Sequence, residues 1–274
     1  MSYKSILVPI DGSPQSKQRV AVAARIAAAF QAELAGIAVV APLELPSRLR
    51  GPGPKAVLTE EFDKSIANAE SLAQAFAAQA RAAGAPAADA KVVQGEPVEA
   101  LTAAAQSADL VVLSQPDADD VGILGGHFVE DALTSLGRPV LLVPRKHDVQ
   151  EVGRHIMIAW KNADGSARAV ADARPLLEKA ETITVVAVEE DGTVGGTGEA
   201  LAALQRLGAS AKSVVVKADD AGAAILAQAK KAGADLIVMG ALRHHRLTEM
   251  ILGGATRTVL EKASVCVLMS HGGA

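Results

Sequence analysis

The residues with the clearest capacity for chemistry lie in the second half of the chain, around three glycines and a threonine. Gly240 ends a short apolar run, and Gly253, Gly254 and Thr256 come just before the apolar positions of an expected helix. Backbone N–H groups at a helix start have no partner inside the helix, so such a loop can bind a phosphate or another anion. The same glycines are also ordinary at a strand end and a helix start, and the pattern alone leaves both interpretations open.

These residues need a scaffold, and short apolar runs that alternate with alanine-rich segments predict one. Apolar runs without a polar–apolar alternation are typical of strands buried on both faces. A stretch rich in Pro and Gly at 42–54 is expected to be an irregular loop, and 145–153 a polar linker. Strands are expected at 6–10, 34–40, 90–93, 110–113, 139–143, 155–160, 182–188, 213–216, 236–239 and 265–269, with helices at 15–30, 58–83, 97–106, 166–179, 198–207 and 221–231 and around Val259.

The chain contains an internal repeat. The run Ile6–Ile10 corresponds to Ile156–Trp160, and Ala108–Leu113 corresponds to Ala234–Met239. We therefore expect two tandem α/β domains, at 1–147 and 153–274, each a doubly wound parallel sheet covered by helices. Ligands of such sheets bind beyond the carboxyl ends of the strands, where the strand order reverses, here between the first and fourth strands of each half.

Composition excludes several classes of function. The net charge of −4 gives no basic face for a nucleic acid backbone, so no nucleic acid partner is expected. Half of the residues are hydrophobic but only 2% are aromatic, so the core must consist of Ala, Val, Leu and Ile. The single cysteine, Cys266, lies in an expected strand, which indicates a small core residue and a reducing compartment.

No segment of the sequence has the pattern of a membrane or export element. The N-terminus enters a strand directly, without a basic region followed by a long apolar one. No apolar run approaches the ~20 residues that span a bilayer. We expect a cytoplasmic protein without a membrane partner.

Three segments together resemble the universal stress protein family: Val8–Ser13, Ala234–Ala241 and Ile251–Leu260. The resemblance covers essentially the whole chain, as two copies of the family domain. It implies five-stranded sheets with the strand order 3-2-1-4-5, paired through their last strands. The two halves would then form an intramolecular pseudo-dimer, with a homodimer of such chains also open.

Some members of that family bind ATP through a Gly-x2-Gly-x9-Gly-Ser/Thr loop and an Asp at the end of the first strand. In the second half Gly240 and Gly253 match the first and third glycines. However, Arg243 and Gly254 replace the second glycine and the Ser/Thr, and Lys161 stands at the position of the Asp. The resemblance therefore implies a degenerate phosphate loop in this half.

The first half departs from the same pattern in the opposite way. Asp11 matches the aspartate that faces the nucleoside in the family, but Ser114 replaces the first glycine and Gly126-His127 replaces Gly-Ser/Thr. ATP or AMP is thus a possible ligand, with neither half complete. Further candidates that the resemblance implies are Pro9, Ser13 and Val39 in the first half and Ala159 and Val188 in the second.

Basic side chains around the second loop offer a different ligand site. Arg243, His244, Arg246 and Lys161 could converge near the helix start at Gly253, forming a pocket for an anion bound in part by bidentate Arg. The alternative is that these are solvated surface side chains, as most loop charges are.

Other motifs fail. The acidic stretch at 117–122 resembles the start of a calcium-binding loop, but Val121 stands at the fifth position of that loop and Phe128 at the twelfth, where Glu is required. The neighbouring residues His244 and His245 point to different faces of any regular element, so they are a poor pair of metal ligands. No metal site is therefore expected. The sequence contains no P-loop lysine motif and no nucleophile elbow. The leading hypothesis is a stress-response protein without catalysis that acts through unknown protein partners. The alternatives are a nucleotide-gated ATP- or AMP-binding protein and a weak nucleotide hydrolase.

Overall fold

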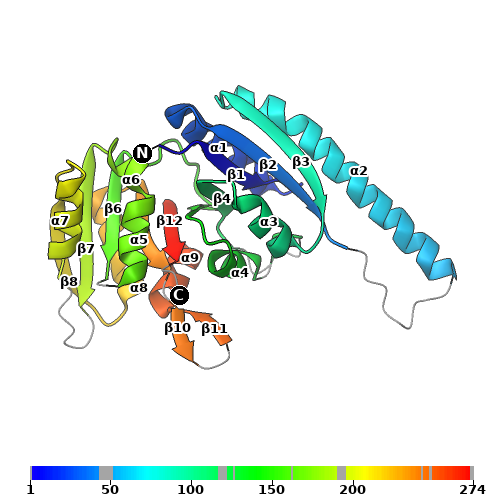
Figure 1. Ribbon diagram of the computed structural model, residues 1–274. Helices are drawn as coiled ribbons and strands as arrows, with labels where there is room; N and C mark the ends of the chain where they lie inside the picture. The colour runs from blue at the N-terminus through cyan, green and yellow to red at the C-terminus, as the bar shows by residue number, and fades with distance from the viewer. Residues whose placement is uncertain are drawn as a thin grey trace.

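The computed structural model describes residues 2–42, 52–116, 122–125, 127–161, 163–189, 196–241, 243–246 and 249–271 (Figure 1). For 52–56, 243–246 and 249–252 the description covers the backbone alone. None of the helices in these segments is long and apolar enough to cross a membrane.

Strands and helices alternate along both halves of the chain. The strands are β1 (Ser5–Pro9), β2 (Glu33–Val40), β3 (Ala87–Gln94), β4 (Leu110–Ser114), β5 (Val140–Val143), β6 (His155–Trp160), β7 (Thr182–Glu189), β8 (Lys212–Lys217), β9 (Leu236–Ala241), β10 (Arg243–Arg246), β11 (Glu249–Leu252) and β12 (Cys266–His271). The helices are α1 (Pro14–Phe30), α2 (Pro52–Ala82), α3 (Pro97–Ala105), α4 (Phe128–Ser135), α5 (Asp164–Asp172), α6 (Arg174–Leu177), α7 (Gly198–Arg206), α8 (Ala221–Ala232) and α9 (Gly254–Lys262).

The two halves share one ten-stranded sheet. Its order is β3-β2-β1-β4-β5-β12-β9-β6-β7-β8, so each half has the expected order 3-2-1-4-5. Pairing is parallel within each half and antiparallel between β5 and β12, where Leu141 lies opposite Leu268. The prediction of two doubly wound domains joined through their last strands is confirmed, and we call the halves domain 1 and domain 2.

Helices cover both faces of the sheet, and the core is aliphatic as the composition predicts. One apolar cluster lies beneath α1, α2, α5, α6 and α7. The other lies beneath α3, α4, α8 and α9. The α1 alanines Ala23 and Ala27 are fully buried. Because their side chains are short, the helix packs close to the sheet.

Four sequence expectations need correction. The helix expected at 166–179 is two helices that meet at Ala173, because Pro175 has no N–H to continue the ladder. The predicted loop at 42–54 is too long, because α2 already begins at Pro52, where proline in a first turn loses no hydrogen bond. The segment after β9 is the hairpin β10–β11 rather than a loop. Gly240 lies inside β9 and does not end it.

The domains are also joined by side chains away from the sheet. Tyr3 of domain 1 donates its hydroxyl to the Asp172 carbonyl of domain 2, at 2.8 Å. Gln115 at the end of β4 donates to the Ala263 carbonyl, at 3.2 Å. Burial raises the pKa of Tyr3 well above its usual range, and the negative charge of Asp172 adds to this effect. The junction therefore contains specific polar contacts as well as apolar packing.

Candidate functional site

The turn from β1 into α1 places two polar side chains at the carboxyl edge of domain 1. Ser13 is the N-cap of α1, and its hydroxyl accepts a hydrogen bond from the Ser16 N–H at 3.2 Å. Pro14 follows at the first helical position, as predicted. One oxygen of Asp11 accepts hydrogen bonds from the Ser13 N–H at 2.9 Å and the Ser13 hydroxyl at 2.5 Å. The carboxylate of Asp11 is thus held by the turn that starts the helix.

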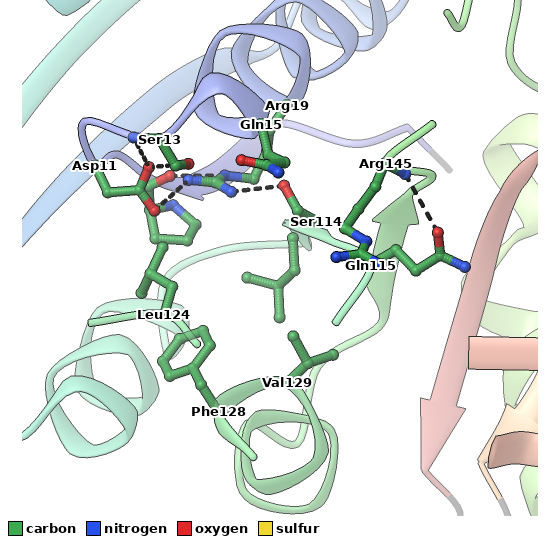
Figure 2. Close-up of a pocket in the computed structure, with 12 residues that line it drawn as sticks. Asp11, Ser13, Gln15, Arg19, Ser114, Gln115, Leu124, Phe128, Val129 and Arg145 are labelled. Carbon is green, nitrogen blue, oxygen red and sulfur yellow. Dashed lines mark hydrogen bonds and ion pairs between the residues drawn. The ribbon is translucent and has the colours of Figure 1, made fainter. Parts of the chain in front are cut away.

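Arg19 joins the carboxyl ends of the neighbouring strands β1 and β4 (Figure 2). Only 2% of this residue is exposed. Its Nε donates to the Pro9 carbonyl at 2.9 Å, Nη1 to the Ser114 hydroxyl at 2.6 Å, and Nη2 to the second oxygen of Asp11 at 3.3 Å. The buried guanidinium is therefore neutralised and hydrogen-bonded on three sides, which a buried charge requires.

A cavity of about 460 Å³ opens beside this cluster, above the carboxyl ends of β1 and β2. Its wall includes Asp11 and Ser13 from the β1–α1 turn and Val39 from β2. The middle of α2 contributes Ser65 and Asn68. The strand order reverses between β1 and β4, so this cavity lies beside the expected position, over β1 and β2, and reaches the β4–α4 connection at Gly122 and Ile123.

A much smaller cavity lies on the other side of Asp11, towards α4 (Figure 2). Its volume is about 20 Å³, which is little more than the space of one water molecule. Phe128 and Leu124 fill it from the β4–α4 side, and Arg145 faces it from the segment after β5. The first turn of α4 carries Glu130 and Asp131, which oppose anion binding at this helix start.

At the corresponding position of domain 2, helix backbone lies against the sheet. The Lys161 N–H donates to the Ser166 hydroxyl at 3.2 Å, just as the Asp11 N–H donates to Ser16 in domain 1. By the same offset of 150, Ala169 occupies the position of Arg19 and is fully buried. A Cβ on Gly240 would lie 2.5 Å from the backbone carbon of Gly165. Gly240 therefore allows α5 to pack directly onto β9, and no arginine fits between them.

The predicted phosphate loop of domain 2 forms a hairpin that extends away from the ten-stranded sheet (Figure 1). Arg243 pairs with Leu252 at the base of the hairpin, beside the N-cap Gly253, whereas Arg246 pairs with Glu249 at its other end. The side chains of Arg243, His244 and Arg246 lie outside the described part of the structure. Their convergence with Lys161, whose side chain is exposed, stays a prediction.

Sequence comparison assigns the family. The sequence model of the universal stress protein family matches residues 2–144 and 154–271. The chain belongs to the universal stress protein family. This assignment agrees with the strand order in both domains and with the motifs at Asp11 and Gly240 that suggested it. The comparison with curated proteins gave no match.

Solved structures of other universal stress proteins are similar to this one. One from Archaeoglobus fulgidus DSM 4304 matches 98% of this chain and 98% of its own, with a TM-score of 0.76 and 20% identity. A putative one from Pseudomonas aeruginosa UCBPP-PA14 matches 98% of this chain and 93% of its own, with a TM-score of 0.59 and 18% identity. These similarities show the tandem fold. A universal stress protein in complex with cAMP is 29% identical over 52% of this chain and 98% of its own, with a TM-score of 0.41.

The structure of this universal stress protein brings together part of the predicted site. Asp11 and Ser13 line both cavities of domain 1, Pro9 lines the smaller one, and Val39 lines the larger one. In domain 2, Gly254 begins α9 as expected. Thr256 is buried in the first turn, and its hydroxyl has no hydrogen-bond partner among the described residues. Ala159 is buried and Val188 half-buried at the ends of β6 and β7.

Sequence reasoning missed Arg19, Ser65 and Asn68. An arginine inside an otherwise alanine- and valine-rich helix, eight residues after Asp11, was a usable signal for a buried ion pair. The two α2 residues gave no signal, because their approach to the cavity depends on how α2 crosses β2. Cys266 is a buried core residue as expected, and burial raises the pKa of its thiol to about 12.

Among the described residues, no group of three or more His, Cys, Asp or Glu side chains could hold a metal ion.

Proposed function

We propose that this universal stress protein binds an adenine nucleoside or nucleotide in domain 1 and acts through protein partners rather than by catalysis. The cavity of about 460 Å³ at the ends of β1 and β2 supports this most strongly. Its volume lies within the roughly 300–1,000 Å³ that small-molecule sites occupy. It also contains Asp11, the residue that the family resemblance assigns to the nucleoside side.

The chemistry of Asp11 favours binding over hydrolysis. This carboxylate is the acidic side chain in the described wall of the cavity. One of its oxygens accepts two hydrogen bonds from Ser13, and the other accepts one from Arg19. A general base must accept a proton from the attacking group, and a carboxylate engaged in this way is poorly placed to do so. The alternative is weak hydrolysis of ATP. It predicts that the protein releases phosphate from ATP and that this activity remains after further purification.

The experiment is to denature protein purified without added ligand and to identify released small molecules by mass spectrometry. Stripped protein is then titrated with adenosine, AMP and ATP by calorimetry. Gly12→Trp should weaken binding at least about 50-fold, because a Cβ on Gly12 meets nothing within 4 Å and its side chain would extend into the cavity. Gly198→Trp is the matched control, since Gly198 has the same open surroundings at the start of α7.

Two results would refute the proposal. One is a wild-type protein that neither retains nor binds any of the three ligands. The other is binding that Gly12→Trp and Gly198→Trp leave equally unchanged, because the ligand would then occupy a different site.

A second candidate is an anion site at the start of α9 in domain 2. Gly253 is its N-cap, the first turn contains no acidic residue, and the buried Thr256 hydroxyl lacks a partner among the described residues. Lys161→Ala should then lower the affinity for inorganic phosphate or ATP. If this substitution leaves the affinity for every tested anion unchanged, the candidate is wrong.

A further inference from the structure

The turn from β1 into α1 contains a polar cluster that its counterpart in domain 2 lacks. We call the side chains of Asp11, Arg19 and Ser114 the arginine cluster. At the three equivalent positions domain 2 has Lys161, Ala169 and Gly240. The turn of domain 2 nevertheless forms, and it keeps the hydrogen bond from the Lys161 N–H to the Ser166 hydroxyl. A turn of this kind therefore does not need the arginine cluster in order to fold.

Burying Arg19 is also costly. Only 2% of the residue is exposed, so its guanidinium has exchanged nearly all of its hydration for protein contacts. Apolar residues of similar volume often stabilise a protein as well as a buried ion pair does, or better. Together with the turn of domain 2, this cost indicates that the guanidinium serves a purpose besides folding.

That purpose is visible in the contacts of Asp11 (Figure 2). Its Oδ1 accepts two hydrogen bonds from Ser13, and its Oδ2 accepts one from Nη2 of Arg19 at 3.3 Å. The planar guanidinium is itself anchored by the Pro9 carbonyl and the Ser114 hydroxyl, so the position of Nη2 is fixed. The carboxylate is thus held at both oxygens. Because a carboxylate has about four acceptor sites, Oδ2 can accept one further hydrogen bond.

Arg19 and Asp11 differ in which cavity they line. Asp11 belongs to the walls of both cavities, whereas Arg19 belongs to the wall of the smaller one and not to the described wall of the larger one. A ligand in the larger cavity would therefore meet Asp11 directly. Arg19 would act on that ligand through the carboxylate that it holds.

We infer that Arg19 is a positioning residue for ligand binding in domain 1. It orients the carboxylate of Asp11 so that Oδ2 accepts a hydrogen bond from a hydroxyl or amino group of the ligand in the larger cavity. Ser114 contributes by anchoring the guanidinium from β4. This inference rests on the proposed function, because it concerns the ligand of the same site.

The test is a double-mutant cycle on ligand affinity with Arg19→Met, Asp11→Asn and their combination. The stripped full-length proteins are titrated by calorimetry with adenosine, AMP and ATP. Arg19→Met should lower the affinity for the tightest of these ligands about 10-fold, the effect of losing one hydrogen bond of ordinary strength. In the Asp11→Asn background it should change the affinity less than about 2-fold, because no oriented carboxylate is left to disturb.

Arg25→Met is the matched control. Arg25 lies on the same helix and donates to the carbonyls of Val149 and Gln150, so its loss removes structural hydrogen bonds at the segment between the domains. It should leave the affinity unchanged. Ser114→Ala is the second variant, for the case that Arg19→Met does not fold or that Asp11→Asn binds too weakly to measure. It leaves Asp11 and Arg19 in place and should lower the affinity about 3-fold.

Three results would overturn the inference while leaving the proposed function standing. One is an affinity that Arg19→Met and Ser114→Ala leave at the wild-type value. Another is an equal loss from Arg19→Met in both backgrounds, which a role in folding alone predicts. The third is an equal loss in the Arg25→Met control. A wild-type protein that binds none of the three ligands would refute the inference and the proposed function together.

Discussion

Replacing Arg19 by methionine should destabilise domain 1 more than most single substitutions do. Methionine keeps the length of the side chain but removes every donor. The Pro9 carbonyl and the Ser114 hydroxyl would each lose a charged donor, at 2.9 and 2.6 Å. Asp11 would lose its ion pair but keep its hydrogen bonds from Ser13.

The magnitude follows from burial. The side chains of the Arg19–Asp11 pair are only 2% and 15% exposed, so solvent screens it little. Breaking a buried pair on one side costs about 3–5 kcal/mol. Because Asp11 keeps other donors, we expect the lower part of that range, about 3 kcal/mol, against a total stability of roughly 5–15 kcal/mol for a domain.

Urea denaturation followed by circular dichroism measures this loss, and the slope of the transition shows whether the denatured state has changed. Trp160, the single tryptophan, lies in β6 and reports on domain 2 in the same samples. An exposed ion pair contributes at most about 1 kcal/mol to the free energy of unfolding. If Arg19→Met lowers this free energy by less than that, the assignment of a buried, structural guanidinium is wrong.

Domain 2 suggests the control for this experiment, because it has Ala169 and Gly240 where domain 1 has Arg19 and Ser114. The variants Arg19→Ala, Ser114→Gly and their combination form a double-mutant cycle. Ser114→Gly should cost less in the Arg19→Ala background, with a coupling energy of about 1–2 kcal/mol, because the hydroxyl has already lost its partner. Additive losses would mean that the 2.6 Å hydrogen bond contributes nothing.

Two further predictions concern packing and pH. Gly240→Ala should destabilise domain 2 by about 2–3 kcal/mol, because the added Cβ would meet the Gly165 backbone. Gly198→Ala is the control and should be close to neutral, because a Cβ there lies in open space. Unfolding of both variants is followed by tryptophan fluorescence. Tyr3 should ionise well above its unfolded value of 10.0, as ultraviolet titration of this single tyrosine can show. Because the pKa is raised on folding, its contribution is complete below about pH 10 and is lost as pH rises towards the folded value. Tyr3→Phe should remove that part of the alkaline loss, and an equal loss in both proteins would contradict the assignment.

The proposals for domain 1 rest on how distant segments meet at one edge of the sheet. Asp11 and Ser13 belong to a local turn whose sequence, Asp-Gly-Ser-Pro, already indicates an N-cap and a helix start. Asn68 lies far along the chain, and only the packing of α2 brings it to the same cavity.

The sequence by itself determined the family and the tandem repeat, because apolar periodicity and short motifs depend on nearest neighbours along the chain. The strand order was implied by the family resemblance. It also indicated the turn at Asp11 and the helix start at Gly253. It was misleading at Gly240, where an end of the strand was expected. The glycine serves the contact with Gly165, which lies 75 positions earlier.

Only the tertiary structure revealed the cavity beside Asp11 in domain 1. Arg19 and Ser114 are separated by 95 residues and meet because β1 and β4 are neighbours in the sheet. Whether the ends of two neighbouring strands are covered by a guanidinium, a cavity or a helix backbone depends on the sum of side-chain volumes contributed by several elements. That sum cannot be read from spacing along one segment, which is why the cavity beside Asp11 appears only in the folded chain.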